Sequence, residues 1–273
     1  MKTISHVALF IFLVSSYSCG KTNDSNKPKP LITELEIQEV LKNQNFECAS
    51  LGGICPNGIA RIFIINKVKP DRSSVCTGFM ISTSRLVTNH HCVATQQQCS
   101  NTYLAIYTGS NHMQTKCKSI VKTIEDIGDP NDPNRKLDFT VMEITDNYSD
   151  DFFLLADTPA VADDLISTWV IDQTGLDSIP GNLLDSRITE FSCTVVDENE
   201  RASLFLENCP IISGNSGSPA LNNRGEVIGV IWGGSASTVD SSYDLNSRRK
   251  LNAIGLATEV KYFRDYLISD MVL

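Results

Sequence analysis

The sequence predicts an all-β fold, and two observations support this class. From about residue 61 onward, short apolar runs recur and are separated by polar or glycine-containing turns, with Asn222-Asn223-Arg224-Gly225 as the clearest hairpin signal. Strands at this spacing are typical of sandwiches and barrels. At the end of the chain, residues 259–269 have apolar side chains at helical spacing, which predicts a C-terminal helix. The predicted strands are residues 62–65, 78–81, 103–107, 119–124, 139–144, 168–171, 188–196, 204–206, 227–232 and 253–258.

Residues 1–18 indicate a secretory signal, because Lys2 precedes an apolar run at residues 7–14 that is too short to span a bilayer. Cys19 follows directly and resembles the lipidated cysteine of bacterial lipoproteins, although Ser16 stands where that motif usually has leucine. The sequence leaves open whether Cys19 is lipidated or the signal is cleaved nearby in the ordinary way. In both cases we expect an exported protein, either a periplasmic or cell-surface lipoprotein or a secreted protein.

Residues 19–57 are predicted to form a tether followed by a strap or a pro-segment. Residues 21–30 are polar and contain two prolines, which is typical of a flexible tether. Residues 31–46 carry spaced apolar side chains with acids between them, which indicates a short amphipathic helix. The sequence does not decide whether this segment is removed or packs on the domain that residues 58–273 form.

The composition excludes several classes of function. The net charge is −9, and removal of residues 1–18 takes away only Lys2, so that −9 becomes −10. Arg248-Arg249-Lys250 is too small a patch to hold nucleic acid. The sequence contains neither a phosphate-binding glycine loop nor a further apolar run of membrane-spanning length. We expect no cofactor, a membrane contact only through a lipid anchor, and a monomer.

The tract at residues 212–219 holds a candidate nucleophile, Ser216, on a tight turn. Gly214 and Gly217 can adopt backbone conformations that are closed to other residues. The N–H groups of Gly214 and Ser216 can then point into one small space that holds an oxyanion beside the Ser216 hydroxyl. A serine hydroxyl needs a neighbouring base, and the base needs a group that holds its tautomer. His91 and Asp138 precede Ser216 in the order His, Asp, Ser and are the candidates for these roles.

The residues around this trio resemble the trypsin/chymotrypsin family of serine endopeptidases. That family has a cysteine directly after its catalytic histidine, bridged to a cysteine sixteen residues earlier, and Cys92 and Cys76 stand at these positions. His91, and not His90, therefore corresponds to the base, and a Cys76–Cys92 disulfide is implied. The aspartate of the family lies in a strand that reads Asp-apolar-X-apolar, and Asp138 begins such a strand.

The serine tract is similar to that of bacterial members of the family. Residues 214–219 read Gly-Asn-Ser-Gly-Ser-Pro, and the apolar stretch at residues 226–234 ends in Trp-Gly-Gly. Together they resemble the staphylococcal glutamyl endopeptidase branch. The resemblance covers about residues 58–270. It implies two packed six-stranded antiparallel β-barrels (chymotrypsin-like) with a C-terminal helix.

In the arrangement that the resemblance implies, barrel one spans about residues 58–160 and supplies His91 and Asp138. Barrel two spans about residues 161–258 and supplies Ser216. Ser216 would attack a peptide carbonyl, His91 would transfer the proton, and Asp138 would orient His91. The partner would be a protein or peptide substrate, and neither a metal nor a cofactor is needed.

One position departs from the trypsin branch of the family. In that branch an aspartate precedes the catalytic serine and pairs with a new N-terminus that zymogen cleavage releases. Asn215 occupies this position, and an uncharged amide cannot make that ion pair. We therefore expect no activation of the trypsin kind.

Eight cysteines remain when Cys19 is set aside, an even number that an exported chain can oxidise. Besides the implied Cys76–Cys92 bond, Cys99–Cys117 would flank a predicted hairpin, and Cys193–Cys209 would join two neighbouring strands. Cys48–Cys55 would then close a small local loop, although the sequence alone leaves other pairings open. A zinc site is not expected, because no Cys-X-X-Cys pair occurs.

We expect the residues just before the serine and those of the Trp-Gly-Gly strand to form the walls of the substrate pocket. Pro210 stands where the trypsin branch has an acid at the base of the pocket. A basic side chain of a substrate would therefore find no acidic partner there. Ile211 and Ile231 replace the threonine and histidine of the glutamyl endopeptidase, and burying a carboxylate against them would cost several kcal/mol. The glycines of the strand, with Gly255, leave an open apolar pocket that favours Leu, Met or Phe before the scissile bond. The predicted pocket residues are Pro210, Ile211, Ile231, Trp232, Gly233 and Gly234.

A second class of function is a catalytically weak or inactive, protease-like binding module at the cell surface. All three catalytic positions are filled, which argues against it, but a sequence does not show their geometry. A bacterial dipeptidyl peptidase is a further alternative, since some share the Thr-Asn-His-His-Cys tract of residues 88–92. Such enzymes need a large helical insertion, and the 77 residues between Asp138 and Ser216 hold too little helical pattern for it.

Overall fold

The structure is a computed structural model of the chain. The chain divides into two units at Pro30, and all described residues belong to the unit Leu31–Leu273. The predicted secretory signal, Cys19 and the polar tether lie outside the described residues. The structure describes residues 33–50, 52–66, 73–109, 111–126, 137–173, 185–198, 203–234 and 253–264.

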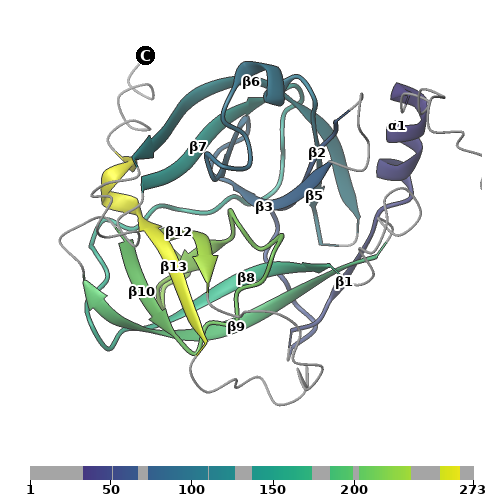
Figure 1. The fold of residues 1–273 in the computed structure, drawn as a ribbon. Coiled ribbons are helices and arrows are strands. Elements are labelled where there is room, and N and C mark those ends of the chain that lie inside the picture. Colours follow the sequence, from purple (N-terminus) through teal and green to yellow (C-terminus); the bar gives the residue numbers. More distant parts are fainter. Residues whose placement is uncertain are drawn as a thin grey trace, which may run out of the picture. The chain divides into compact units, whose positions relative to one another are not determined.

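Barrel one is a closed antiparallel barrel with the strand order β2-β3-β4-β7-β6-β5 (Figure 1). Strands β2 and β5 are buried along their whole length. One face of these strands packs into the barrel, and helix α1 (Glu34–Lys42) covers side chains of the other face. The strands are β2 (Ile59–Ile64), β3 (Ser74–Met80), β4 (Arg85–Thr88), β5 (Thr102–Tyr107), β6 (His112–Asp126) and β7 (Leu137–Ile144).

Barrel two has the strand order β9-β10-β13-β12-β11-β8, and the pairing of β8 with β9 closes it. The predicted all-β, chymotrypsin-like fold with two six-stranded antiparallel barrels is therefore confirmed. The strands are β8 (Leu165–Gln173), β9 (Asp185–Glu198), β10 (Ser203–Glu207), β11 (Pro219–Leu221), β12 (Val227–Gly234) and β13 (Ile254–Glu259).

The predicted C-terminal helix is described only at its start. After β13 the chain forms a short 3-10 helix, η2 (Val260–Tyr262), and residues 265–269 of the predicted helix lie outside the described residues. Phe263 is fully buried, and its ring centroid lies 4.9 Å from that of Phe139 in β7. The end of barrel two thereby packs against barrel one.

Residues 33–48 pack on the barrels as a strap. Thr33 begins α1 with a capping box that it forms with Glu36, which satisfies N–H groups that a helix start leaves unpaired. Ile37 and Leu41 are buried against barrel one. Strand β1 (Asn45–Cys48) then pairs in parallel with β9 of barrel two. The helix agrees with the sequence pattern, whereas β1 was not predicted.

The Ser186 hydroxyl of barrel two binds both the strap and Arg61 of barrel one. This β2 side chain is only 2% exposed, and its guanidinium donates to the Ser186 hydroxyl in β9. The Gln44 amide of the strap donates to the same hydroxyl at 2.8 Å. Burial lowers the pKa of the Arg61 guanidinium to about 10, so that it still carries its charge at neutral pH.

The eight cysteines after Cys19 form four disulfides, which are the four pairs expected from the sequence. A short helix, α2 (Gln96–Cys99), carries one of these cysteines. Disulfides persist in oxidising compartments, so that four of them fit an exported chain. Within the described ranges, no helix is long and apolar enough to cross a membrane. The pairs are Cys48–Cys55, Cys76–Cys92, Cys99–Cys117 and Cys193–Cys209.

Replacement of Leu41 by alanine is expected to destabilise the protein by about 2–5 kcal/mol, because it leaves a cavity between α1 and barrel one. Leu35→Ala in the same helix is the matched control, since Leu35 is 81% exposed. Urea unfolding of both variants measures the difference. Equal midpoints for the two variants would show that α1 does not belong to the cooperatively folded domain.

Candidate active site

His91 and Asp138 form a hydrogen-bonded pair. The Nδ1–H group of His91 donates to Oδ2 of Asp138 at 2.6 Å, and the His91 backbone N–H donates to Oδ1 at 3.1 Å. The Asp138 side chain is fully buried, whereas that of His91 is 36% exposed. Because Nδ1 is hydrogen-bonded to Asp138, a proton that the His91 ring takes from a substrate or nucleophile goes to Nε2.

Two buried side chains hold the backbone of Asp138. Asn89 Nδ2 donates to the Asp138 carbonyl oxygen at 2.7 Å. The Asp138 N–H donates to the Thr258 hydroxyl at 3.0 Å, and Thr258 belongs to β13 of barrel two. The acid of the pair is thus positioned across the barrel interface. Sequence reasoning missed both residues. Asn89 lies in the tract that contains His91, but no local signal distinguishes Thr258.

His90 has different partners from His91. Its Nδ1 lies 2.8 Å from the Thr123 hydroxyl, and its Nε2 lies 3.2 Å from Oε2 of Glu125. Both partners are in β6, and the His90 side chain is 20% exposed. Of the two neighbouring histidines, His91 is therefore the one that contacts Asp138.

The loop that carries Ser216 is seated on barrel one. The Thr77 N–H donates to the Ser216 carbonyl oxygen at 2.8 Å, and the Thr77 hydroxyl donates to the Gly214 carbonyl oxygen at 2.9 Å. Thr77 is itself held by the Thr88 hydroxyl, which donates to its carbonyl oxygen at 2.8 Å. Gly217 has a φ of 92°, and a Cβ there would lie 1.9 Å from the Thr77 oxygen. Only glycine lets the loop come this close.

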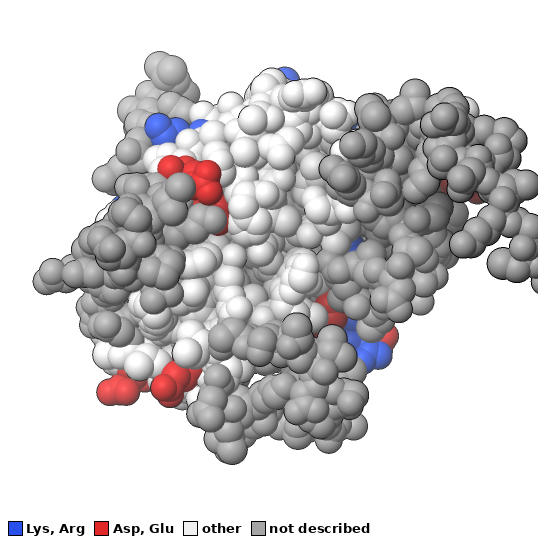
Figure 2. Space-filling model, in the orientation of Figure 1, with Lys and Arg blue, Asp and Glu red and all other residues white. Residues whose placement is uncertain are grey.

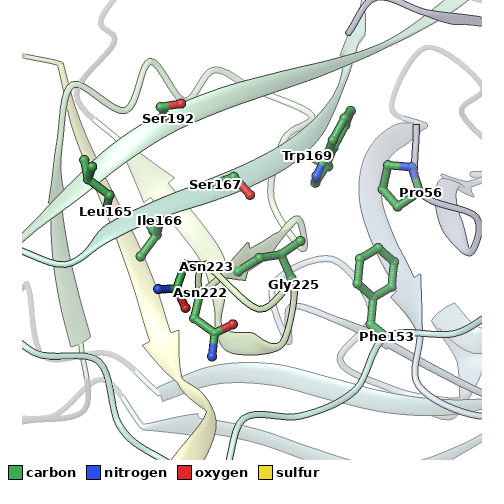
Figure 3. A pocket seen from close by; sticks show the side chains of 11 residues that line it. Pro56, Phe153, Leu165, Ile166, Ser167, Trp169, Ser192, Asn222, Asn223 and Gly225 are labelled. Atoms are coloured by element: carbon green, nitrogen blue, oxygen red, sulfur yellow. The ribbon is translucent and has the colours of Figure 1, made fainter. Parts of the chain in front are cut away.

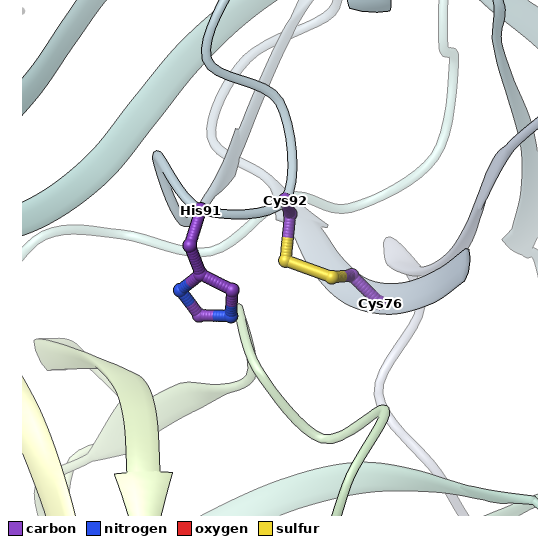
Figure 4. Close-up of side chains that lie close together, drawn as sticks. All are labelled: Cys76, His91 and Cys92. Atoms are coloured by element: carbon purple, nitrogen blue, oxygen red, sulfur yellow. A yellow bond between two sulfur atoms is a disulfide. The ribbon is translucent and has the colours of Figure 1, made fainter. Parts of the chain in front are cut away.

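The Cys76–Cys92 disulfide connects this contact to His91. A ring nitrogen of His91 and the two sulfurs lie within 4.8 Å of one another (Figure 4). The two sulfurs are bonded to each other, so that neither offers the thiolate that a metal ion would need. Cys92 follows His91, and Cys76 precedes Thr77, which binds the Ser216 loop. The disulfide thereby joins the chain beside His91 to the chain beside the Thr77 contact with the Ser216 loop. Among the described residues, no hydrogen bond joins the Ser216 hydroxyl to His91.

The loop also leaves two N–H groups available. The N–H groups of Asn215 and Ser218 close turns within the loop, and that of Gly217 donates to the Ile231 carbonyl oxygen at 2.8 Å. Within the described residues, the N–H groups of Gly214 and Ser216 donate no backbone hydrogen bond. Two unengaged N–H groups on one loop can stabilise an oxyanion.

A family model described as "Trypsin-like peptidase domain" matches residues 76–230, which is more than half of the 273-residue chain. The chain belongs to the trypsin-like peptidase family. None of the curated proteins matches it. As a member of a peptidase family with a protease fold, it is expected to act on proteins or peptides.

Solved structures resemble the fold of this trypsin-like peptidase at low sequence identity. The active form of the Rv3671c protease from M. tuberculosis has 15% identity and a TM-score of 0.50, over 78% of this chain and 80% of that chain. The inactivated protease paralogue S-D1 of the scabies mite has 16% identity and a TM-score of 0.53, over 78% and 91%. GrC has 13% identity and a TM-score of 0.54, over 78% and 93%. These likenesses concern the fold alone.

The predicted pocket residues of the peptidase lie in two neighbouring segments. Pro210 and Ile211 are buried directly after the Cys193–Cys209 disulfide. Ile231 to Gly234 end β12, where Ile231 is fully buried and Trp232 lies at a β-bulge. A Cβ on Gly234 would lie 2.7 Å from the Ile211 Cβ, and one on Gly255 would lie 3.3 Å from the Ile211 Cγ1. The expectation of open space is therefore wrong at these two glycines, because Ile211 occupies it. At Gly233 the space is open, since a Cβ there would have only the Leu256 Cδ1 nearby, at 4.0 Å.

A separate cavity is lined by residues of β8 and of the turn between β11 and β12, together with Pro56 and Phe153. It measures about 460 Å³, and aromatic side chains of Trp169 and Phe153 line it together with Leu165 (Figure 3). None of the predicted site residues lines it. On the face of the molecule shown in Figure 2, uncharged residues cover most of the described surface, and the few Lys and Arg side chains lie at its margins.

Gly217→Ala is expected to destabilise the peptidase by about 2 kcal/mol more than Gly225→Ala, because overpacking at Thr77 adds to the backbone strain. Gly225 is the matched control, since its φ is 75° and nothing lies within 4 Å of a Cβ there. Chemical unfolding of the two variants provides the comparison. Equal losses would mean that the Ser216 loop can move away from barrel one at no cost.

Proposed function

We propose that the chain is a serine endopeptidase that uses Ser216 as nucleophile, His91 as general base and acid, and Asp138 as the group that orients His91. The observation that carries the proposal is the buried Asp138 carboxylate, which is 2.6 Å from His91 Nδ1, next to a Ser216 loop bonded to Thr77. The trypsin-like peptidase family supports a peptidase of this general kind.

In the proposed mechanism, the Ser216 hydroxyl attacks the carbonyl carbon of a peptide bond while His91 Nε2 takes its proton. The His91 cation is stabilised by Asp138 and then gives the proton to the leaving amine. The N–H groups of Gly214 and Ser216 stabilise the oxyanion, an effect of about 3 kcal/mol per donor. Water then hydrolyses the acyl-enzyme by the same steps.

The proposed specificity is for apolar residues before the scissile bond. Ile211 and Ile231 are both buried, and they stand where the glutamyl endopeptidase branch has polar groups. A buried carboxylate would find no partner on these side chains. Because Ile211 fills the space beside Gly234 and Gly255, we propose small to medium side chains such as Ala and Val rather than Leu, Met or Phe. The serine tract still resembles the glutamyl endopeptidase branch, but these two residues do not support its specificity.

Export is the proposed location, and the four disulfides support it. Lipidation of Cys19 and a monomeric state belong to the same proposal. A protease-like binding module is the alternative. One structure that shares the fold is an inactivated protease paralogue, so that this fold also occurs without activity. Reaction with a fluorophosphonate distinguishes the two, because it requires an activated serine.

Ser216→Ala is expected to lower kcat by roughly three or more orders of magnitude and to abolish fluorophosphonate labelling, because the nucleophile is lost. Ser213→Ala is the matched control, since Ser213 is an exposed serine of the same loop. Peptide turnover and labelling should be measured with circular dichroism as a check of folding. A Ser216→Ala protein that turns over peptides at the wild-type rate would refute the proposed mechanism.

Ile211→Ala is expected to raise kcat/KM for peptides with Phe before the scissile bond, relative to peptides with Ala, by roughly tenfold, because it opens apolar volume beside Gly234. Ile212→Ala is the control, since Ile212 is 42% exposed. A digest of a peptide library measures both preferences. Dominant cleavage after Glu, Asp, Lys or Arg by the wild-type protein would contradict the apolar specificity.

A further inference from the structure

A chain of hydrogen bonds runs from one side of His91 to the other. On the side before His91, Nδ1 of His90 lies 2.8 Å from the Thr123 hydroxyl oxygen. On the side after it, the Val93 carbonyl oxygen accepts the Thr140 hydroxyl at 2.8 Å. The two attachments are connected, because the hydroxyl oxygens of Thr123 in β6 and Thr140 in β7 lie 2.6 Å apart. The backbone on both sides of His91 is therefore fastened to the same two strands of barrel one.

The direction of this chain follows from its carbonyl end. A carbonyl oxygen can only accept, so that the Thr140 hydroxyl donates its one hydrogen to Val93. The Thr140 oxygen then accepts the hydrogen of Thr123, and the Thr123 oxygen accepts from His90. The His90 ring therefore carries a proton on Nδ1 and donates it to β6.

The second ring nitrogen of His90 lies beside Glu125, which is the cross-strand partner of Asp138. The distance from Nε2 of His90 to Oε2 of Glu125 is 3.2 Å. Directly opposite residues of an antiparallel pair lie on the same face of the sheet, and Glu125 of β6 is opposite Asp138 of β7. Two consecutive histidines thus contact two opposing residues of one sheet face, His91 on β7 and His90 on β6.

We propose that His90 is a positioning residue of the peptidase, which keeps the backbone of His91 at the place where the His91 ring meets Asp138. The inference rests on the proposed function, in which Nε2 of the same ring must reach the nucleophile. The His91 side chain is 36% exposed, and among the described residues its Nδ1 contact with Asp138 is the only hydrogen bond of the ring. The direction of Nε2 therefore depends on how firmly the turn at residues 89–93 is held.

Two replacements of His90 separate its two contacts. The side-chain NH₂ of asparagine can take the place of Nδ1, so that His90→Asn keeps a donor for Thr123. The NH₂ of glutamine reaches the place of Nε2, so that His90→Gln keeps a donor for Glu125 instead. Only Thr123 leads on to the Val93 carbonyl oxygen, and the asparagine variant is therefore expected to be the more active of the two.

The test compares His90→Asn, His90→Gln, Thr123→Val and Thr123→Ser in the full chain. Thr115→Val is the matched control, since Thr115 is also in β6 and its hydroxyl oxygen lies 3.0 Å from that of Thr145, but it lies outside this chain of hydrogen bonds. Three properties are measured: kcat and KM on peptides, the rate of fluorophosphonate labelling, and hydrogen exchange of the peptide that covers residues 89–94. Thermal melts establish that each variant is folded.

Thr123→Val is expected to lower kcat by about 10- to 100-fold with little change in KM, because Nε2 of His91 loses its alignment while the predicted substrate pocket lies in barrel two. Thr123→Ser should regain most of the lost kcat, since a serine hydroxyl can also donate and accept. His90→Asn should exceed His90→Gln in kcat by about tenfold. Hydrogen exchange of residues 89–94 should be faster in Thr123→Val than in Thr115→Val.

The inference is overturned if Thr123→Val equals Thr115→Val in both kcat and hydrogen exchange, if Thr123→Ser is no more active than Thr123→Val, or if His90→Gln is as active as His90→Asn. If Thr123→Val does not fold, the two His90 variants decide, because they leave the threonine hydroxyls in place. Hydrogen exchange does not depend on catalysis. If the wild-type protein neither labels nor hydrolyses peptides, the proposed function fails, while exchange in Thr123→Val still decides whether this chain holds the turn.

Discussion

The close contact between the two barrels at Gly217 is the constraint on which the candidate site depends. The missing side chain lets the Ser216 loop of barrel two reach the Thr77 backbone of barrel one, where a Cβ would lie 1.9 Å from an oxygen atom. Thr77 binds both Ser216 and Gly214, and Thr88 holds Thr77 in turn. Any residue larger than glycine would separate the barrels at the point where their functional groups meet.

Buried polar groups near this contact pair across the barrels, beside apolar contacts such as that of Phe263 with Phe139. Thr258 of barrel two accepts the N–H of Asp138, which lies in barrel one. Within barrel two, Asn215 is fully buried, and its side-chain NH₂ donates to the Ile171 carbonyl oxygen of β8. Buried polar groups without partners would cost about 1–3 kcal/mol each, so that such pairs favour one relative placement of the barrels. The strap adds a further link through Arg61, Ser186 and Gln44.

The fold class could be predicted from the sequence, because apolar runs of strand length and turn residues are local features. Three strands were missed for physical reasons. β4 and β11 are short, and β11 begins with Pro219, which has no N–H to donate. β1 is the parallel partner of β9 across more than a hundred residues, and a pairing at that distance leaves no local pattern. The helix at residues 34–42 was visible because its periodicity is local as well.

The sequence by itself determined which chemical groups are available: a serine between glycines, a histidine beside a cysteine, an aspartate at the start of a strand, and eight cysteines besides Cys19. These follow from residue identity and short spacing. The tertiary structure alone decided that Ile211 fills the space beside Gly234, that Thr258 holds Asp138, and that the Asn215 amide meets the Ile171 carbonyl oxygen. Each of these contacts joins segments that are distant in the chain. Their partners are set by barrel closure and strand register, which no short stretch of sequence contains.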